Sequence, residues 1–146
     1  MAINLQTATA IEVAAMTVWG EARGSGIRCM HAVMNVITNR VSHPGWWGSD
    51  YRGVCLHQWQ FSCWNPGDPN RGQVLGVSSG DELFRWALGI ASDLLHGRLR
   101  DSVAGADSYY DVSIPAPPWT IGLQPVAQIG TLRFYNTRGA QSAPST

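Results

Sequence analysis

The sequence predicts a single α+β domain that is mainly α-helical, with long loops and a few short strands. Three stretches carry apolar residues at the spacing of an amphipathic helix, near the N-terminus, over residues 27–41 and over residues 79–97. An extended segment rich in glycine, proline and asparagine separates the second stretch from the third. The length of 146 residues suits one compact domain and is short for two.

The first helix is expected from about Thr9 to Glu21. Thr7 or Thr9 can cap its start, because a threonine hydroxyl accepts a hydrogen bond from the free N–H groups of the first turn. Gly24 and Gly26 then end it, since glycine suits the left-handed conformation that often follows a helix. Its apolar positions are Ile11, Ala14, Ala15, Val18 and Ala22.

The second helix is expected from about Ile27 to Val41, with Ser25 as its cap and with Pro44 and Gly45 ending it. Its inner face consists of Ile27, Met30, Val33, Met34, Ile37 and Val41. Residues 43–78 then form the longest irregular region, and a long loop inside a compact domain is usually functional or disordered. Its aromatic content argues against disorder. The four tryptophans of this Trp-rich loop, which either stack on sugar rings or belong to the core, are Trp46, Trp47, Trp59 and Trp64.

The third helix has the clearest ends. Ser79 and Glu82 have the spacing of a capping box, and Gly97 stands where a C-terminal cap is expected. Its inner face consists of Phe84, Ala87, Leu88, Ala91, Leu94 and Leu95. A proline-rich turn follows, and a short strand is predicted near Leu132–Tyr135. We expect one domain over residues 1–138 and a flexible tail over residues 139–146.

Charge and cysteine content exclude several classes of protein. Ten arginines, with no lysine, balance ten acidic residues, so no basic surface for nucleic acid is expected. No apolar run reaches about 18 residues, the length of a membrane-spanning helix, and the N-terminus does not resemble a signal peptide. Cys29 is expected to be buried, and a disulfide between Cys55 and Cys63 stays open. A zinc site at Cys55, His57 and Cys63 is disfavoured because the spacing is not that of standard ligand pairs.

Glu21 is the acid best placed for chemistry. It lies at the end of the first helix beside Trp19, where desolvation and the helix dipole both disfavour a further negative charge. Arg23 opposes this effect if it points inward. A protonated carboxyl can donate its proton to a glycosidic oxygen. From these local features alone, a surface or capping role is the commoner explanation of such a glutamate.

Longer motifs favour a catalytic role of Glu21 over a surface or capping role. Residues 18–24 read Val-Trp-Gly-Glu-Ala-Arg-Gly, residues 32–41 read Ala-Val-Met-Asn-Val-Ile-Thr-Asn-Arg-Val, and residues 60–62 read Gln-Phe-Ser. Two weaker motifs follow, Asp-Ser-Val-Ala-Gly-Ala at residues 101–106 and Ile-Gly-Thr-Leu-Arg-Phe-Tyr at residues 129–135. In this order the motifs resemble the SleB-like cell-wall hydrolase family, that of the spore-cortex-lytic enzymes, from Ile11 to Tyr135.

The resemblance implies a lysozyme-like fold and a peptidoglycan-cleaving muramidase that needs no cofactor and no metal. By matching position, Glu21 would be the general acid and then the base of a lytic transglycosylase. Such an enzyme cleaves the β-1,4 bond between N-acetylmuramic acid and N-acetylglucosamine and leaves a 1,6-anhydro end. This route needs no second carboxylate, whereas ordinary hydrolysis uses one. Hydrolysis stays open, because several acids could supply it: Asp50, Asp68, Asp101, Asp107 and Asp111.

Substrate contacts are expected from the same motifs. Gln60 could bind an N-acetyl group or the reacting region, or it could organise its own loop. The aromatic candidates, which either line the groove or belong to the core, are Trp59, Phe61, Trp64, Tyr109, Tyr110 and Tyr135. Asn39 and Arg40 end the second helix, and for them helix capping or a structural hydrogen bond is as good an explanation as substrate contact. The chain departs from the family at Val103, where threonine is expected, and at Leu132, where histidine is expected, which puts substrate contacts of those side chains in doubt.

Two other functions stay open beside a muramidase, namely a non-catalytic glycan-binding module that uses the Trp-rich loop and a metal-dependent amidase or peptidase. The expected partner is the glycan strand of peptidoglycan, with no nucleic acid, no membrane insertion and a monomeric state. A catalytic domain without an export signal is typical of a phage endolysin, made in the host cytoplasm and acting on the wall in the periplasm. A domain taken from a longer exported enzyme would look the same.

Overall fold

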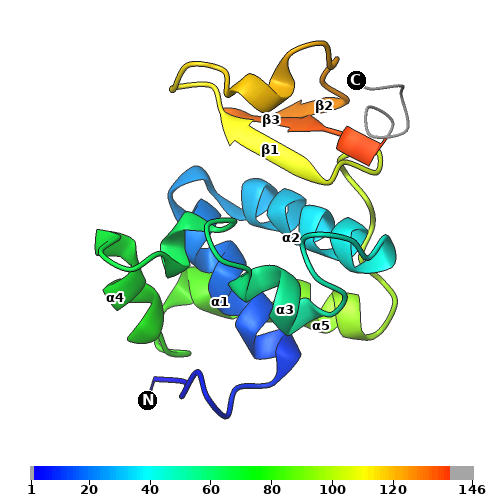
Figure 1. The fold of residues 1–146 in the computed structure, drawn as a ribbon. Coiled ribbons are helices and arrows are strands. Elements are labelled where there is room, and N and C mark those ends of the chain that lie inside the picture. The colour runs from blue at the N-terminus through cyan, green and yellow to red at the C-terminus, as the bar shows by residue number, and fades with distance from the viewer. Residues whose placement is uncertain (1, 139–146) are drawn as a thin grey trace.

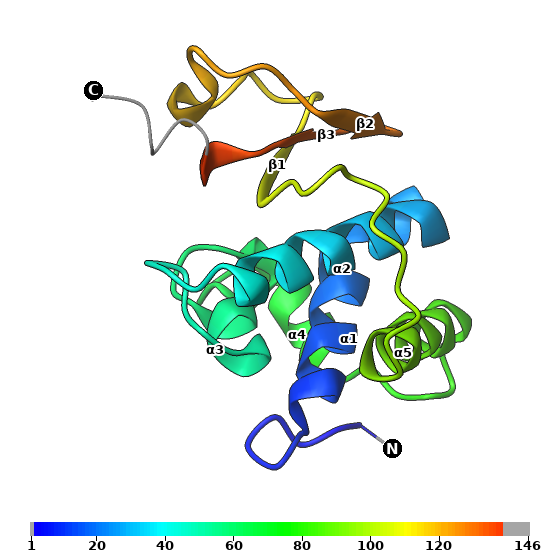
Figure 2. The ribbon, with the colours of Figure 1, turned by 90° about the vertical axis from the view of Figure 1, so that its right-hand side faces the viewer.

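The computed structural model describes residues 2–138, which form two layers (Figures 1 and 2). A layer of α-helices lies on one side, and a small antiparallel sheet covers it on the other. The helices are α1 (Ala10–Ala22), α2 (Ile27–Ser42), α3 (Tyr51–Leu56), α4 (Pro69–Leu75) and α5 (Glu82–Leu95). The strands are β1 (Ser108–Asp111), β2 (Ala127–Ile129) and β3 (Leu132–Tyr135). The prediction of a mainly helical α+β fold is confirmed.

Helix α1 runs through the middle of the helical layer, and the other four helices pack against it (Figure 2). A capping box starts it: the Thr9 hydroxyl accepts from the Glu12 N–H at 3.1 Å, and the Glu12 carboxylate accepts from the Thr9 N–H at 2.9 Å. Thr9 is therefore the cap. Most of the helix is buried, because small and apolar side chains cover all its faces. A helix enclosed in this way holds Glu21, near its end, in a defined place.

The predicted cap of α2 is wrong. Ser25 lies in a short 3₁₀ helix, Arg23–Ser25, and the residue before α2 is Gly26, with a φ of 96° and no side-chain cap. Glycine is favoured there because L side chains rarely adopt a positive φ. The predicted inner face of α2 is largely confirmed, since Met30, Val33, Met34 and Ile37 are fully buried.

The capping box predicted for α5 is also wrong. Asp81, and not Ser79, caps the helix by accepting from the Phe84 N–H at 2.9 Å. The same carboxylate oxygen accepts from the Trp19 indole N–H at 3.0 Å, so it joins α5 to α1. Of the predicted inner face, Phe84, Ala87 and Ala91 are buried, whereas Leu95 is 64% exposed. The helix ends there, because Gly97 follows with a φ of 69°.

The region of residues 43–78 is not the unbroken loop that the sequence predicts. It contains α3, which Asp50 caps through the Gly53 N–H, and α4, which Asp68 caps through the Asn70 N–H. A 3₁₀ helix at Ser62–Trp64 lies between them. These helices have six and seven residues, too few to show an apolar period in the sequence.

The sheet has the order β1-β3-β2, with both pairs antiparallel. The predicted strand at Leu132–Tyr135 is confirmed as the central strand β3. Tyr109 of β1 pairs with Phe134 of β3, and the Phe134 side chain is fully buried in the core. Side chains alternate across a strand, so Tyr109 and Phe134 share the face that meets the helices.

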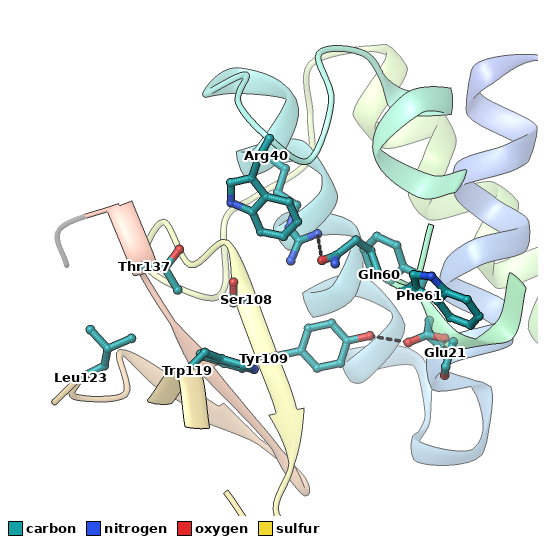
Figure 3. A pocket seen from close by; sticks show the side chains of 12 residues that line it. Glu21, Arg40, Gln60, Phe61, Ser108, Tyr109, Trp119, Leu123 and Thr137 are labelled. Carbon is teal, nitrogen blue, oxygen red and sulfur yellow. Dashed lines mark hydrogen bonds between the residues drawn. The ribbon is translucent and has the colours of Figure 1, made fainter. Parts of the chain in front are cut away.

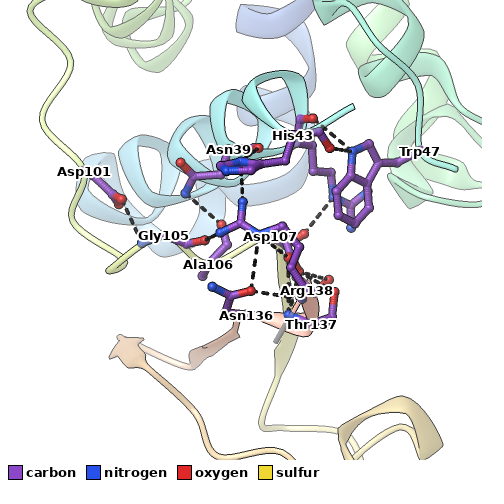
Figure 4. Close-up of polar contacts among 12 residues, drawn as sticks. Asn39, His43, Trp47, Asp101, Gly105, Ala106, Asp107, Asn136, Thr137 and Arg138 are labelled. Atoms are coloured by element: carbon purple, nitrogen blue, oxygen red, sulfur yellow. Dashed lines mark hydrogen bonds and ion pairs between the residues drawn. The ribbon is translucent and has the colours of Figure 1, made fainter. Parts of the chain in front are cut away.

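A polar network attaches the sheet to α2 (Figure 4). Asp107, immediately before β1, is fully buried and accepts from the Thr137 hydroxyl at 2.7 Å and the Thr137 N–H at 3.1 Å. It also pairs with the Arg138 guanidinium at 3.5 Å. From α2, Asn39 donates to the Ala106 carbonyl at 2.8 Å, which supports the structural role left open for Asn39. The Arg138 guanidinium further contacts His43 at the end of α2.

All three cysteines lie within residues 2–138, and each is buried and free of a disulfide. The burial expected of Cys29 is confirmed. Burial raises the pKa of the Cys55 thiol to about 12 and raises that of Cys63 further. None of the helices described in residues 2–138 is long and apolar enough to cross a membrane. The predicted tail, residues 139–146, lies outside the described residues.

Candidate active site

A cavity of about 680 Å³ opens between the helices and the sheet (Figure 3). Its volume is that of a pocket for a small ligand or a few sugar units. Its lining comes from α1, α2 with the loop after it, residues 59–62, β1, the segment between β1 and β2, and the segment after β3. The lining residues are Glu21, Arg40, Trp46, Trp59, Gln60, Phe61, Ser62, Ser108, Tyr109, Trp119, Leu123 and Thr137.

Hydrogen bonds hold the Glu21 carboxylate at both oxygens. The Tyr109 hydroxyl donates to Oε1 at 2.8 Å, reaching from β1 across the cavity (Figure 3). The Cys63 backbone N–H donates to Oε2 at 3.0 Å, and the Ser62 hydroxyl donates to the same oxygen at 3.4 Å. Three donors from two separate parts of the chain, β1 and the 3₁₀ helix at Ser62–Trp64, therefore orient one carboxyl group. This is the arrangement expected of a group that must present an oxygen to a ligand.

Tyr109 remains a hydrogen-bond donor over a wide pH range. Burial and the neighbouring Glu21 carboxylate both raise the pKa of its hydroxyl well above the ordinary value. An ionised phenolate beside a carboxylate would bring two negative charges together at short range. Tyr109, predicted as a substrate contact, thus lies against Glu21 and can orient it as well as line the cavity.

Gly20, the residue before Glu21, allows α4 and the 3₁₀ helix at Ser62–Trp64 to approach α1 closely. A Cβ atom on Gly20 would lie 2.6 Å from Val74 Cγ2 and 2.9 Å from Cys63 Cβ. The absence of a side chain therefore lets α4 and the Cys63 N–H reach α1. Arg23 does not point into the cavity. It lies over the Trp19 ring and donates to the Trp19 carbonyl at 3.3 Å, so it closes the C-terminal end of α1.

Arg40 and Gln60 form a second polar pair in the cavity. Arg40 Nη1 donates to Gln60 Oε1 at 3.1 Å (Figure 3). Arg40 Nε donates to the Asp107 carbonyl at 2.7 Å. Arg40 is 6% exposed, and burial lowers the pKa of its guanidinium. Its guanidinium carbon lies 5.2–5.7 Å from ring centroids of Trp46, Trp47 and Phe61. Arg40 therefore forms a structural hydrogen bond, to the Asp107 carbonyl, and it also lines the cavity.

Exposed tryptophans surround the cavity. Trp46, Trp59 and Trp119 all line it, and they are 55%, 63% and 40% exposed. Trp59 has a φ of 66°, a conformation that is strained for a bulky residue. Such strain is found most often at functional sites. Large apolar rings open to water suit the stacking of sugar rings.

Three of the predicted substrate contacts lie outside the cavity lining. Trp64 donates its indole N–H to the Thr17 hydroxyl at 3.0 Å and belongs to the helical layer. Tyr110 and Tyr135 are buried and stack on each other, with ring centroids 6.1 Å apart. Both rings contact the ring of Trp119, so they support a side chain that lines the cavity.

No acid other than Glu21 lines the cavity in the described part of the chain. Each acid considered for hydrolysis has a structural partner instead. Asp50 and Asp68 cap helices, Asp101 accepts from the Val103 and Gly105 N–H groups, and Asp111 accepts from the Ser113 N–H. Asp107 is fully buried in the network beneath the sheet.

Residues 24–135 match the model of a protein family described as cell wall hydrolase. This match spans well over half of the chain. The chain belongs to this family. The resemblance inferred from the motifs is confirmed, and so is the prediction of an enzyme that degrades the bacterial cell wall. The matched region begins at Gly24, after Glu21, so the case for Glu21 rests on the geometry of the cavity and on its motif.

Two solved structures resemble this cell wall hydrolase. The catalytic domain of the germination-specific lytic transglycosylase SleB from Bacillus anthracis is 23% identical, with a TM-score of 0.68 over 87% of this chain and 93% of that one. The catalytic domain of the Bacillus cereus SleB protein is 22% identical, with a TM-score of 0.67 over 87% of this chain and 89% of that one. These likenesses confirm the predicted lysozyme-like fold. No curated protein sequence matches the chain.

The two departures of this hydrolase from the family pattern lie in its interior. Val103 is fully buried, and Leu132 is 4% exposed, and neither lines the cavity. Sequence reasoning did not name five of the lining residues as contacts: Ser62, although it ends the Gln-Phe-Ser motif, and Ser108, Trp119, Leu123 and Thr137. Trp119 had a signal, because it is a tryptophan that follows a proline-rich turn. Leu123 and Thr137 had none, since folding alone brings them to the cavity.

Proposed function

We propose that this cell wall hydrolase is a lytic transglycosylase that cleaves the β-1,4 bond between N-acetylmuramic acid and N-acetylglucosamine, with Glu21 as general acid and then base. The observation that carries the proposal is that Glu21 is the one carboxylate among the described residues that line the cavity. Glycoside hydrolysis ordinarily uses two carboxyl groups on either side of the bond. A cavity with one suits a reaction in which the substrate supplies its own nucleophile.

The reaction needs one proton carrier. The Glu21 carboxyl first donates a proton to the bridging oxygen as the bond from that oxygen to muramic C1 breaks. The resulting carboxylate then takes the proton of the muramic C6 hydroxyl, whose oxygen forms the new bond to C1. The product ends in a 1,6-anhydro ring, no water is consumed, and Glu21 is returned to its protonated form.

Residues around Glu21 have supporting roles in this proposal. Tyr109 and the Cys63 N–H keep the carboxyl facing the cavity, as their distances of 2.8 and 3.0 Å indicate. Trp46, Trp59 and Trp119 would stack on the sugar rings of the strand. The SleB domain of B. anthracis, a lytic transglycosylase with the same fold, supports the same chemistry here.

Mass spectrometry of muropeptides released from purified sacculi tests the proposal. We expect wild type to release anhydromuramic products and Glu21→Gln to release none. Glu82→Gln is the matched control, because Glu82 lies exposed on α5 away from the cavity, and it should behave like wild type. Products with reducing muramic acid would mean hydrolysis. Glycan binding without cleavage by wild type would mean a binding module, and undiminished release by Glu21→Gln would remove that residue from the reaction.

The endolysin role and the place of action stay predictions from the sequence. Expression in the bacterial cytoplasm, with and without a separate membrane-permeabilising protein, tests them. We expect intact cells when the enzyme is expressed alone and lysis when the membrane is opened. Lysis by the enzyme alone, or enzyme found in the periplasm before the membrane is opened, would argue for an exported enzyme. Gel filtration with light scattering tests the predicted monomer.

A further inference from the structure

Thr17 is a polar residue in an otherwise apolar turn of α1. It is fully buried, and so are Met16 and Val18 on either side of it. Threonine is a poor helix former, and a buried hydroxyl is costly unless it is hydrogen-bonded. The Thr17 hydroxyl donates to the Val13 carbonyl at 2.7 Å, and its oxygen accepts from the Trp64 indole N–H at 3.0 Å. The core therefore contains a hydroxyl that joins two separate parts of the chain.

Thr17 and Glu21 lie on the same face of α1, because they are four positions apart. The 3₁₀ helix at Ser62–Trp64 contacts α1 at both positions. At Glu21 it supplies the Ser62 hydroxyl and the Cys63 N–H, at 3.4 and 3.0 Å from Oε2. At Thr17 it supplies the Trp64 indole N–H, and the Cys63 thiol donates to the Thr17 carbonyl at 4.0 Å. This short helix therefore has two anchor points on α1, and one of them is the candidate acid.

The position of the 3₁₀ helix depends on these anchors. A helix of three residues has too few internal hydrogen bonds to be rigid by itself. The contact at Glu21 fixes one end of it and leaves the other end free to turn. The bond between the Trp64 indole and the Thr17 hydroxyl removes that freedom. A shift of about 1 Å would take the Cys63 N–H out of hydrogen-bond range of Glu21.

We infer that Thr17 and Trp64 are positioning residues, which hold the Cys63 N–H and the Ser62 hydroxyl against the Glu21 carboxylate. The inference rests on the proposed function. Neither Thr17 nor Trp64 lines the cavity, so neither touches a glycan strand bound there. Trp64 then assists the reaction from outside the cavity, unlike the exposed tryptophans that line it.

Steady-state rates of glycan-strand cleavage by Thr17→Val and Trp64→Phe test the inference. Each substitution removes one partner of the hydrogen bond and keeps a side chain of similar shape. We expect each to lower kcat about tenfold and to leave KM within about twofold, because a displaced donor acts on the reacting carboxyl and not on substrate binding. A variant with both substitutions should be no slower than the slower single variant, since the two remove the same bond.

Three control variants separate positioning from general damage. Thr17→Ser keeps the hydroxyl and should keep kcat close to that of wild type. Thr38→Val removes a hydroxyl of α2 that donates to the Met34 carbonyl at 2.9 Å and, within residues 2–138, accepts from no side chain. Trp86→Phe removes an exposed indole of α5 outside the cavity lining. Thr38→Val and Trp86→Phe should both keep the wild-type kcat and KM.

The assays are made well below the thermal unfolding of each variant, so that the possible failures are distinct. Lower stability of Trp64→Phe with an unchanged kcat would mean that the bond supports the fold alone, and this result overturns the inference. A raised KM with an unchanged kcat would place Trp64 in contact with substrate, and it overturns the inference too. Thr17→Ser as slow as Thr17→Val would show that the hydroxyl is not the anchor. If Thr17→Val does not fold, Trp64→Phe and Thr17→Ser decide. A wild type that cuts no glycan strand would instead overturn the proposed function.

Discussion

At the level of single residues, the Glu21 carboxyl owes its orientation to side chains far away in the sequence. Tyr109 is 88 positions from Glu21 and donates to it at 2.8 Å. The Cys63 N–H and the Ser62 hydroxyl come from the 3₁₀ helix at Ser62–Trp64, which lies between Glu21 and Tyr109 in the chain. A carboxyl at the end of a helix would otherwise sample several rotamers in water, and each donor removes some of that freedom.

Tyr109→Phe should lower kcat about 10- to 100-fold, because a hydrogen bond to a charged group contributes roughly 1.5–3 kcal/mol. The ring remains and fills the same space, so the fold should persist. Rates of glycan-strand cleavage with a check of thermal unfolding measure the effect. Tyr51→Phe is the matched control on α3, outside the cavity, and should keep the wild-type rate. An unchanged rate in Tyr109→Phe would mean that the contact does not orient Glu21 for reaction.

The raised pKa of Tyr109 also predicts a dependence of stability on pH. Below the unfolded pKa of about 10, both states keep the proton and the contribution of this group is complete. As the pH rises above it, the unfolded chain ionises first, so stability falls until the folded pKa is reached. Denaturant unfolding from pH 8 to 11 should show a steeper loss for wild type than for Tyr109→Phe. Parallel curves would contradict the raised pKa.

At the level of elements, α4 and the 3₁₀ helix at Ser62–Trp64 can approach α1 because Gly20 has no side chain. A glycine inside a helix costs roughly 0.5–1 kcal/mol relative to alanine. Gly20 is buried in α1 where a Cβ would meet Val74 at 2.6 Å and Cys63 at 2.9 Å. The packing of three elements around the Glu21 carboxyl offsets that cost.

Gly20→Ala should therefore destabilise the protein by about 1–3 kcal/mol, the usual range for overpacking, although alanine is the better helix former. It should also slow cleavage, because the Cys63 N–H must move away from Glu21. Denaturant unfolding and rate measurements check both effects. Gly89→Ala is the matched control in α5, where a Cβ would meet nothing within 4 Å, and it should stabilise by about 0.5–1 kcal/mol. Equal effects of the two substitutions would contradict the close approach.

At the level of the whole molecule, the site exists because two layers are held together. Glu21, Arg40 and Gln60 come from the helical side, and Tyr109 and Trp119 come from the sheet side. The network of Asp107 with Thr137 and Arg138 fastens the start of β1 to the end of β3 and, through Arg40 and Asn39, to α2 (Figure 4). The position of Tyr109 depends on this attachment.

Asp107→Ala should destabilise the protein by about 3–5 kcal/mol, because it leaves buried donors and the Arg138 charge without their partner. Any protein that stays folded should lose cleavage together with the position of Tyr109. Chemical unfolding and cleavage assays measure both. Asp93→Ala removes an acid from an exposed ion pair with Arg98 and should cost less than about 1 kcal/mol. A small effect at Asp107 would mean that the layers are joined chiefly by apolar packing.

Local pattern was sufficient for a large part of the fold. The apolar period located α1, α2 and α5, and the strand signal located β3, because each is long enough or apolar enough to show its burial in the sequence. It was not sufficient for α3 and α4, which are short, nor for the caps of α2 and α5. Asp81 caps α5 and also receives the Trp19 indole N–H, a partner 62 positions away.

By itself, the sequence determined the fold class, the family and the candidate acid, because these follow from short-range periodicity and from motifs that are contiguous in the chain. Only the tertiary structure decided which aromatic side chains face the cavity: Trp46, Trp59 and Trp119 do, whereas Trp64, Tyr110 and Tyr135 pack behind it. It also decided that Arg40 turns the Gln60 amide. The physical reason is that exposure and hydrogen-bond partnership are set by residues distant in the chain, and a local pattern does not contain them.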